Sequence, residues 1–480
     1  MSEELGLSVK KKEDFGKWYL EVVQKAQVLD TRYGLKGFLV YMPTGMLMIK
    51  EVVRLFDVEL QKTGHNPVLF PVVIPEKFMK KEGEHIKGFE KEVFWITHAG
   101  ENKLDERLCL RPTSETAMYP LFSIWIRSHQ QLPLKIYQDC CVYRYETKMT
   151  KPLMRGREFY WIEAHTAHKT FDDAENQTKE DMQTFANVVT KRLGIPFLLI
   201  KRPDWDKFPG AENTYAFEAI LPDGNSLQIG TTHNLGEKFS KVFNIKYLDS
   251  DKKKKYVNQT SYGPGIARIL SAVISIHGDD KGLIFPPVVA PIQIVIVPVY
   301  TKTTKTKVLE KAGELYGRLE EKAFRVYLDD REKYTPGFKF HEWELKGVPL
   351  RIEIGPLDIK NNKVSISRRD SLERMTIDED KMEEHVLEIL DSIGFQLDKR
   401  AKEMMKITDA SNMKEIKEAL KEGGFIRIPF CMKQECAENF KEKTKVEVRG
   451  TLFGKKEKAK GKCAICAADA KKLAYVARSY

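Results

Sequence analysis

The sequence predicts an α+β fold in which a large antiparallel-sheet region precedes a smaller α/β domain and a short cysteine-bearing C-terminal region. Strand-like runs follow one another up to about residue 235 with few helices between them, which favours an antiparallel sheet. Strands and helices alternate after the proline-rich segment 285–291, as is typical of a separate α/β domain. Four cysteines in two close pairs lie beyond residue 399. We therefore expect domains at 1–285, 291–395 and 399–480.

Length and composition agree with this division and narrow the class of protein. A chain of 480 residues favours about three domains. Its 80 basic and 69 acidic side chains give a formal charge of +11, which suits a polyanionic partner, although solvated lysine clusters would give the same excess. No apolar run reaches the ~18 residues of a membrane span, the N-terminus lacks the apolar stretch of a secretion signal, and seven cysteines in so long a chain do not suggest a disulfide framework. We expect a cytoplasmic protein with no membrane partner.

The first region is expected to open with two amphipathic helices, at about 13–30 and 45–62. In the second helix Ile49, Val52, Phe56 and Leu60 recur at three- and four-residue steps. An apolar run at 68–74 is broken by Pro71 and suits an edge strand. Three more helices are expected near 115–128, 171–193 and 265–277.

The second region is expected to hold a mainly parallel sheet, because its strands and helices alternate. The expected strands are 293–299, 325–328, 350–354 and 363–367, and the expected helices are 305–323, 338–346 and 378–390.

A hairpin in the first region carries the most informative residues. Strand-like runs at 135–143 and 159–164 flank a basic loop between Arg144 and Arg157. Two separated arginines, Arg144 and Arg155, can neutralise the ends of a bent nucleoside triphosphate, since planar guanidinium groups match phosphate geometry. Glu146 can accept a hydrogen bond from an adenine amino group, and Phe159 offers a face for base stacking. The alternative is a basic surface hairpin.

Three further segments have the composition of a small polar pocket. Thr113–Ser114–Glu115 lies where a strand gives way to a helix, so it could bind an ammonium group or simply cap the helix. Trp161, Glu163 and His165 alternate along a strand and share one face, which suits either a compact amino acid or a half-buried sheet face. The spacing of His165 and His168 on a strand does not bring two metal ligands together.

Two glycine-containing segments follow downstream. Gln228 lies at a strand end before Thr231 and His233, where its amide could orient a Mg²⁺-bound water or a phosphate. The run from Ser261 to Arg268 places small residues before a helix, so the backbone could approach a ligand closely and Arg268 would add a cation. An ordinary loop remains the alternative for this second segment.

The cysteines of the C-terminal region form a pattern typical of structural zinc. Two close pairs can supply four thiolates in tetrahedral geometry with no position left for water. We expect a closed Zn²⁺ site formed by Cys431, Cys436, Cys463 and Cys466.

Taken together, these motifs identify a resemblance. The chain resembles a class II aminoacyl-tRNA synthetase, and specifically a prolyl-tRNA synthetase of the archaeal and eukaryotic-like type. Helix 45–62 with Pro71 is similar to the dimer-forming first class motif, the hairpin 144–159 to the second, and 263–268 to the third. Region 291–395 is similar to the family's anticodon-binding domain, and the cysteine region to its zinc-bearing C-terminal domain.

The resemblance implies a ligase that activates L-proline with ATP and transfers it to the 3′-terminal ribose of tRNA(Pro), as a homodimer that uses ATP, Mg²⁺ and structural Zn²⁺. Arg144 and Arg268 would be catalytic. ATP would be bound by Arg144, Glu146, Arg155, Gly156, Phe159, Gln228, Thr231 and Arg268, with Gln228 placing Mg²⁺ indirectly. Proline would be bound by Thr113, Ser114, Glu115, Arg144, Trp161, Glu163, His165, His233 and Ser261. The candidates for anticodon contact are Arg351, Arg368 and Arg369, which could equally form a solvated basic rim.

Three features depart from the family pattern. The run from Ser261 to Arg268 is slightly longer than usual, and two residues rather than one separate Cys463 from Cys466. Only about sixty residues separate His168 from Gln228, too few for the editing insertion of many bacterial relatives. Two alternatives stay open: an inactive synthetase-like RNA-binding regulator, which would be expected to have lost an arginine or Glu115, and a sibling synthetase for another small amino acid.

Overall fold

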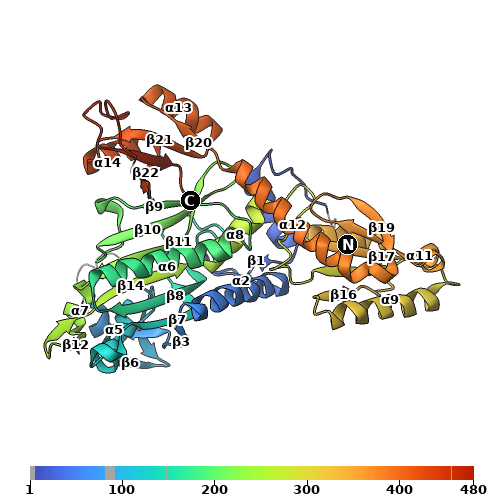
Figure 1. The fold of residues 1–480 in the computed structure, drawn as a ribbon, viewed down its shortest axis with the longest axis horizontal. Helices are drawn as coiled ribbons and strands as arrows, with labels where there is room; N and C mark the ends of the chain where they lie inside the picture. The colour runs from blue at the N-terminus through green and yellow to red at the C-terminus, as the bar shows by residue number, and fades with distance from the viewer. Residues whose placement is uncertain (1–5, 82–91, 148, 456) are drawn as a thin grey trace.

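The computed structural model describes residues 6–81, 92–147, 149–455 and 457–480 (Figure 1). Its main feature is an eleven-stranded sheet that runs through both the first region and the C-terminal region. In spatial order its strands are β20 (Ile407–Asp409), β21 (Phe425–Phe430), β23 (Lys472–Ala477), β22 (Glu447–Leu452), β9 (Leu198–Lys201), β10 (Asn213–Ile220), β11 (Ser226–Gly236), β14 (Asn258–Pro264), β8 (Glu158–His168), β7 (Leu134–Tyr143) and β3 (Asn66–Pro67).

Pairing in this sheet is antiparallel except at its two ends, where β3 runs parallel to β7 and β20 runs parallel to β21. The predicted antiparallel core is therefore confirmed. The expected hairpin is also present, with β7 and β8 paired from Leu134↔Ala167 to Tyr143↔Glu158. The chain from the end of β8 to Gln228 forms only α6 (Phe171–Val189), β9, β10 and a short turn of helix at Asp204–Asp206, so it holds no inserted domain.

One face of the sheet is covered by three helices, α2 (Pro43–Lys62), α6 and α8 (Ile266–His277). Strand alternation sends Ile162 and Ala164 of β8 into the core beneath them. Phe217 of β10 stacks on Phe185 of α6 with ring centres 3.9 Å apart. Trp161 and Glu163 of β8 face the opposite side, which leaves that face of the sheet for a site.

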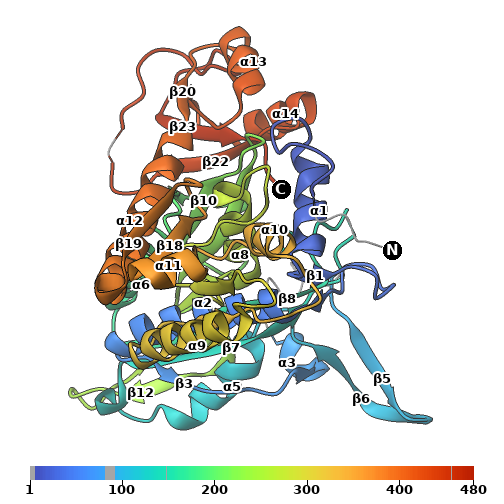
Figure 2. The ribbon, with the colours of Figure 1, turned by 90° about the vertical axis from the view of Figure 1, so that its right-hand side faces the viewer.

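Shorter elements surround this core. The first helix, α1 (Phe15–Lys25), begins after Asp14, whose side chain caps it by accepting a hydrogen bond from the Lys17 backbone N–H at 2.9 Å, and it ends earlier than expected, just before Gln27 with φ +56°. Pro71 separates two short strands where one was expected, β3 and β4 (Val73–Pro75). The β5–β6 hairpin stands out from the body (Figure 2). The other elements here are β1 (Leu29–Asp30), β2 (Val40–Tyr41), α3 (Glu76–Met79), β5 (Trp95–Ala99), β6 (Asn102–Leu110), α5 (Glu115–Trp125), α7 (Lys238–Phe243), β12 (Lys246–Leu248) and β13 (Lys254–Tyr256).

The second region is a separate α/β domain, as expected, but only part of its sheet is parallel. Strands β16, β15 and β17 pair in parallel, whereas β18 and β19 are antiparallel. The segment between Ile354 and Lys363 is shorter than the dozen or so residues that a parallel crossover needs. The domain consists of β15 (Ile294–Pro298), α9 (Lys305–Glu321), β16 (Val326–Leu328), α10 (Pro336–Leu345), β17 (Leu350–Ile354), α11 (Pro356–Asn361), β18 (Lys363–Arg368), β19 (Arg374–Asp378) and α12 (Met382–Met404).

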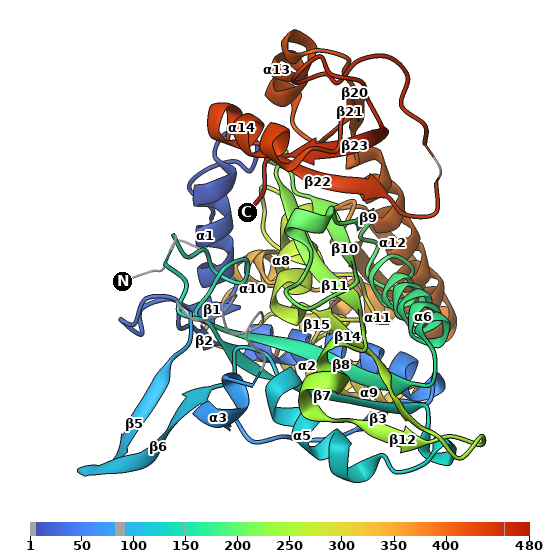
Figure 3. The same cartoon turned by 90° about the vertical axis from the view of Figure 1, so that its left-hand side faces the viewer.

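The C-terminal region is joined to the first region by backbone hydrogen bonds. Helix α12 continues to Met404, so the expected boundary at 395–399 falls inside a helix. Beyond it, β22 pairs with β9 at Thr451↔Lys201 and Leu452↔Ile200, which extends the large sheet without a break (Figure 3). Helices α13 (Met413–Glu422) and α14 (Gln434–Thr444) complete this region. Among the described helices, none combines the length and apolar character needed to cross a membrane.

Candidate active site

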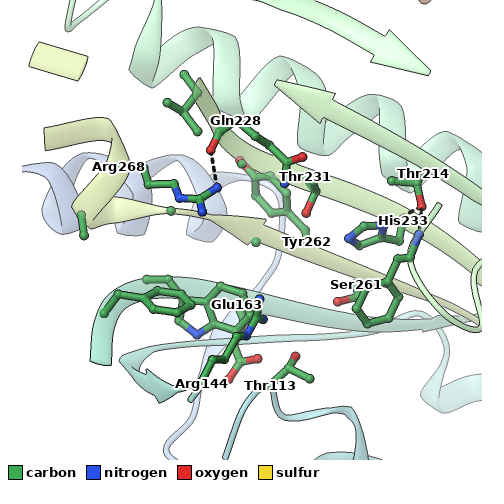
Figure 4. Close-up of a pocket in the computed structure, with 18 of the residues that line it drawn as sticks. Thr113, Arg144, Glu163, Thr214, Gln228, Thr231, His233, Ser261, Tyr262 and Arg268 are labelled. Carbon is green, nitrogen blue, oxygen red and sulfur yellow. Dashed lines mark hydrogen bonds between the residues drawn. The ribbon is translucent and has the colours of Figure 1, made fainter. Parts of the chain in front are cut away.

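A cavity of about 490 Å³ lies on the sheet face that the helices leave uncovered (Figure 4). Strands β8, β10, β11 and β14 supply its sheet face, and the loop between β7 and β8 and the start of α5 supply its walls. It brings together most of the residues that the sequence singled out: Thr113, Glu115, Arg144, Glu146, Arg155, Gly156, Phe159, Trp161, Glu163, Gln228, Thr231, His233, Ser261 and Arg268.

One end of the cavity concentrates positive charge. Arg144 donates to the Pro112 carbonyl at 3.0 Å, and its guanidinium carbon lies 5.4 Å from the ring centres of both Phe159 and Trp161. Arg268 donates to the backbone carbonyls of Met154 and Gln228, each at 2.9 Å. Burial, and then the nearby Arg155 and Arg144, lower the pKa of Arg268 to about 10. A partly buried group of like charges around a cavity favours a polyanionic ligand.

The loop that carries these arginines is fastened at its base. The Arg157 backbone N–H donates to the Gly37 carbonyl at 2.8 Å, and its side chain donates to the Glu146 carbonyl at 3.2 Å. Gly37 has φ +81°, and a Cβ there would approach Arg157 to 2.8 Å. The guanidinium of Arg157 also stacks on Tyr145 at 4.0 Å. Arg157, whose role the sequence left open, therefore holds the loop and does not line the cavity.

The other end of the cavity contains two buried carboxylates. Glu115 accepts hydrogen bonds from the hydroxyls of Thr113 at 2.5 Å and Ser261 at 3.0 Å. Ser114 occupies the N-cap of α5 but makes no capping bond, and its hydroxyl donates to Glu163 instead. The capping alternative for this triplet is therefore wrong, and its side chains serve the carboxylates.

Two expected proline-binding residues lie behind the cavity wall. Ser114 and His165 are fully buried and do not line the cavity. The imidazole of His165 approaches Glu163 at 3.4 Å and the Tyr119 hydroxyl at 3.1 Å. Burial would lower the pKa of His165, but the carboxylates of Glu163 and Glu115 raise it above its ordinary value. Burial likewise opposes ionisation of Glu163, yet His165 and the Ser114 hydroxyl lower its pKa overall. Both shifts favour a charged pair formed by Glu163 at the cavity wall and His165 behind it.

His233 forms an uncharged part of the same pocket. Its Nδ1 lies 2.9 Å from the Thr214 hydroxyl, and its ring centre lies 4.6 Å from that of Phe208. Burial lowers its pKa to about 3, so the imidazole is neutral at physiological pH. Figure 4 shows His233 and Ser261 at the end of the pocket away from Arg268.

Several cavity residues were not anticipated from the sequence. Phe208 and Arg202 follow strand β9 in a loop with no motif of its own, and Arg449 comes from the C-terminal region. Only the pairing of β22 with β9 brings Arg449 here, so no local pattern could have indicated it. The sequence Phe208–Pro209–Gly210 was a turn signal, but nothing in it pointed to a ligand.

The expected zinc ligands converge on one point. The sulfur atoms of Cys431, Cys436, Cys463 and Cys466 all lie within 4.8 Å of one another. The Cys431–Cys466 and Cys436–Cys463 sulfur distances are 3.7 and 4.0 Å. Tetrahedral zinc with Zn–S bonds of about 2.3 Å places its sulfurs about 3.8 Å apart. The donor set therefore fits a structural Zn²⁺ ion.

The arginines considered for anticodon contact are held in ion pairs. Arg351 bonds Glu344 at 3.1 Å, and Arg368 bonds Asp370 at 3.0 Å. Arg369 is buried and bonds Asp279 of the first region, so it joins two domains. These contacts favour structural roles over either of the two roles that the sequence left open, anticodon contact or a solvated rim.

The chain is similar to known proteins over its whole length. Residues 94–277 match the tRNA synthetase class II core domain (G, H, P, S and T), 293–389 an anticodon binding domain, and 413–480 the prolyl-tRNA synthetase C-terminal domain. A proline–tRNA ligase from Thermofilum pendens is 51% identical over 100% of both chains, and one from Pyrococcus abyssi is 48% identical over 98% of each.

A solved structure extends this similarity to the fold. The Giardia lamblia prolyl-tRNA synthetase in complex with prolyl-adenylate has a TM-score of 0.94 and 36% identity, covering 99% of this chain and 100% of that one. Full-length agreement at this level, together with the three domain matches, means that the chain belongs to the prolyl-tRNA synthetase family of class II aminoacyl-tRNA synthetases.

Proposed function

We propose that the chain activates L-proline with ATP to form prolyl-adenylate and pyrophosphate, and then transfers proline to the 3′-terminal ribose of tRNA(Pro). One observation carries this proposal: a single cavity joins a cluster of arginines to a pair of buried carboxylates. The first suits a triphosphate and the second an ammonium group, so the two reactants would meet at Arg144 between them. The family relatives named proline–tRNA ligase support the same reaction.

In the activation step the chain acts by positioning and fixed charge. Phe159 would stack on the adenine, Glu146 would accept a hydrogen bond from the adenine amino group, and Gly156 would let the loop backbone approach the nucleotide. Arg155 and Arg268 would hold the β- and γ-phosphates, with Thr231 beside them. Arg144 would stabilise charge on the α-phosphoryl group as the proline carboxylate attacks it and pyrophosphate leaves. No covalent enzyme nucleophile is required.

Proline selection would depend on the carboxylate end of the cavity. Glu115, supported by Thr113 and Ser261, would receive the charged imino group. Trp161 and His233 would enclose the ring. Glu163 would be held in place from behind by Ser114 and His165, which we assign to support rather than to contact with proline. A missing methylene is worth about 1–3 kcal/mol of discrimination, so alanine should be rejected better than cysteine, which is closer to proline in volume.

Two ions complete the proposal. Mg²⁺ would neutralise the triphosphate; the side-chain oxygen of Gln228 already accepts a hydrogen bond from Arg202 at 2.5 Å, so any role of Gln228 in placing the ion is indirect. Zn²⁺ would be held by the four cysteines as a structural ion. Zinc thiolates and the absence of any disulfide among the seven cysteines fit a reducing cytosol. Cell fractionation tests this location, and recovery of the protein in another compartment would contradict it.

The tRNA and a second copy of the chain are the proposed macromolecular partners. The α/β domain 291–404 would bind the anticodon, and the net charge of +11 suits a polyanion. Dimerisation would use the segment after α2, where Leu69 and Val72 are exposed; Ile124 and Trp125 of α5 are exposed too, and the Trp125 ring lies 6.0 Å from that of Phe70. Light scattering should give twice the 55.4 kDa chain mass, and Leu69→Asp should reduce it; a monomeric wild type would contradict the dimer.

Amino-acid-dependent pyrophosphate exchange tests the function directly. Proline should drive exchange best, cysteine and alanine more weakly, and threonine least. Exchange driven best by threonine or glycine would point to a sibling synthetase. No exchange with any amino acid, in protein that binds tRNA, would point to an inactive regulator. In the second step, charging of tRNA(Pro) should require proline and ATP together.

A further inference from the structure

A buried charge triad connects the C-terminal region to the wall of the ATP site. The carboxylate of Glu218 on β10 is fully buried and accepts hydrogen bonds from Arg202 at 2.5 Å and from Arg449 at 2.6 Å. Its other oxygen accepts the hydroxyl of Ser226. Both arginines are less than a tenth exposed, and both line the cavity. The triad thus places two cations beside the arginines already assigned to the triphosphate.

Two irregularities in the sheet bring these side chains together. In β22 the register shifts between Val448 and Gly450, so Arg449 is the extra residue of a β-bulge. Gly450 has φ +133°, and a Cβ there would come within 2.2 Å of the Lys201 carbonyl on β9. Only glycine allows this approach of the two strands, and the bulge turns Arg449 towards β10.

A second bulge lies across the triad. Between β10 and β11 the register shifts so that Glu218 pairs with Gln228 and Phe217 with Gly230, which leaves Ile229 unpaired. Ile229 is buried in the core under the helices, and Gln228 lines the cavity with Thr231 and His233. Without this bulge, strict alternation would turn Gln228 to the helix face.

The triad then fixes the orientation of Gln228. Arg202 uses the same nitrogen, Nη2, for Glu218 and for the side-chain oxygen of Gln228, at 2.5 Å each. Because a guanidinium only donates, the amide oxygen of Gln228 must face Arg202, and its NH₂ group remains to donate to a ligand. An N–H donor held beside Arg268 is complementary to a phosphate oxygen.

We propose that Arg449 is a positioning residue for ATP, acting through Glu218 and Arg202 to hold the Gln228 amide as a phosphate donor. The C-terminal region is thereby a working part of the activation site and not only an appendage that carries zinc. This inference rests on the proposed function. It assigns no contact with proline to the triad, so disrupting the triad should weaken the use of ATP and leave the use of proline nearly unchanged.

The test compares Arg449→Met with Arg427→Met in pyrophosphate exchange. Arg427 is a matched control on β21 of the same sheet, bonded to Asp409 at 2.6 Å and Glu457 at 2.9 Å, and it does not line the cavity. Arg449→Met should raise the KM for ATP on the order of ten- to a hundredfold, as for a displaced positioning group, with the KM for proline changed less than about twofold. Arg427→Met should change neither, and zinc content should stay equal in both variants.

Two further variants protect the test against misfolding. Arg449→Lys keeps the charge but loses the fork, so it should raise the KM for ATP by an intermediate amount. Glu218→Gln should raise it too, and its combination with Arg449→Met should be less than additive because both act on Arg202. An ATP KM within about twofold of wild type in folded Arg449→Met, or in Arg449→Lys where Arg449→Met does not fold, would overturn the proposal. The proposal would also be overturned if activity with respect to ATP and to proline fell equally and in proportion to the fraction of folded protein. Absence of proline-dependent exchange in the wild type would instead contradict the proposed function.

Discussion

The arginine end of the cavity and the cysteine cluster each gather groups of one charge sign, and they differ in how that charge is to be neutralised. Around that end of the cavity, burial and then the nearby Arg155 and Arg144 lower the pKa of Arg268, and about 490 Å³ of space adjoins these groups. In the cluster, four sulfurs lie within 4.8 Å of one another, with room for a single ion. Thiolates and guanidinium groups each need a counter-charge when buried.

The difference separates a substrate site from a structural one. A cavity with an open volume can receive and release a polyanion at every turnover, whereas four thiolates at tetrahedral spacing leave no position for exchange. Arg268 is also held by the backbone carbonyls of Met154 and Gln228, so those contacts do not cancel its charge. In contrast, Arg351 and Arg368 of the α/β domain are paired with carboxylates.

The largest expected effect comes from opening the closed site. Cys431→Ser should lower zinc from about one ion per chain to near zero, since a structural ion needs all four thiolates. Metal analysis of purified protein measures this, with Cys141→Ser as the control because Cys141 lies on β7 and outside the cluster. If the wild-type protein contained no zinc after purification with zinc present, the four cysteines would not be a structural zinc site.

The next effect concerns the open site. Arg144→Ala should reduce proline-dependent pyrophosphate exchange by a factor on the order of 10²–10³, or about 2.7–4 kcal/mol, by analogy with the loss of one preorganised donor. Zinc content should not change. Arg157→Ala is a comparison variant in the same loop: it removes the stacking on Tyr145 and the bond to the Glu146 carbonyl but keeps the backbone bond to Gly37, so it should cost less activity than Arg144→Ala. A loss below tenfold for Arg144→Ala would contradict the proposal that Arg144 stabilises charge on the reacting phosphate.

The fold could be predicted from the sequence wherever patterns are local. Apolar periodicity predicted α2, helices were also expected near α6 and α8, and the hairpin β7–β8 followed from two strand-like runs around a loop. The α/β domain was recognised from alternation, but its antiparallel strands β18 and β19 were not, because strand direction there depends on the length of one connection. The end of α12 was also missed: a helix was expected only to residue 390, but no proline or glycine stands between residues 395 and 404, and the helix continues to Met404.

The candidate site was predictable where residues are close in sequence. Alternation along β8 placed Trp161 and Glu163 on the cavity face, as observed. The same rule would have turned Gln228 away, and only the unpaired Ile229 restores it. Arg449 depends on a strand pairing across some 250 residues, which no local pattern encodes. Tyr480 is another long-range case: its hydroxyl accepts a hydrogen bond from Lys151 of the β7–β8 loop at 3.0 Å.

The smallest expected effect comes from a buried group to which no counter-ion is supplied. Asp181 on α6 accepts hydrogen bonds from Thr232 at 2.7 Å and Gln177 at 2.8 Å, both neutral. Burial raises its pKa from 3.8 to about 7, so a proton neutralises it, in contrast to the metal and the substrate proposed for the other two sites. Between those two values the folded chain holds a proton that the unfolded chain has released. The free energy of unfolding therefore falls as pH rises through this window and is lowest, for this group, above pH 7.

Asp181→Asn should remove that dependence because the amide is neutral at every pH. Relative to wild type, the variant should gain melting temperature at pH 8 compared with pH 5, by several degrees at about 2–4 °C per kcal/mol for a domain of this size. Glu180→Gln is the matched control, since Glu180 is the adjacent carboxylate and is bonded to the Lys135 ammonium at 2.7 Å. An equal shift at both pH values would mean that Asp181 is ionised in the folded chain. In that case the buried Asp181 carboxylate would need a cationic partner beside α6, because it would not be neutralised by a proton.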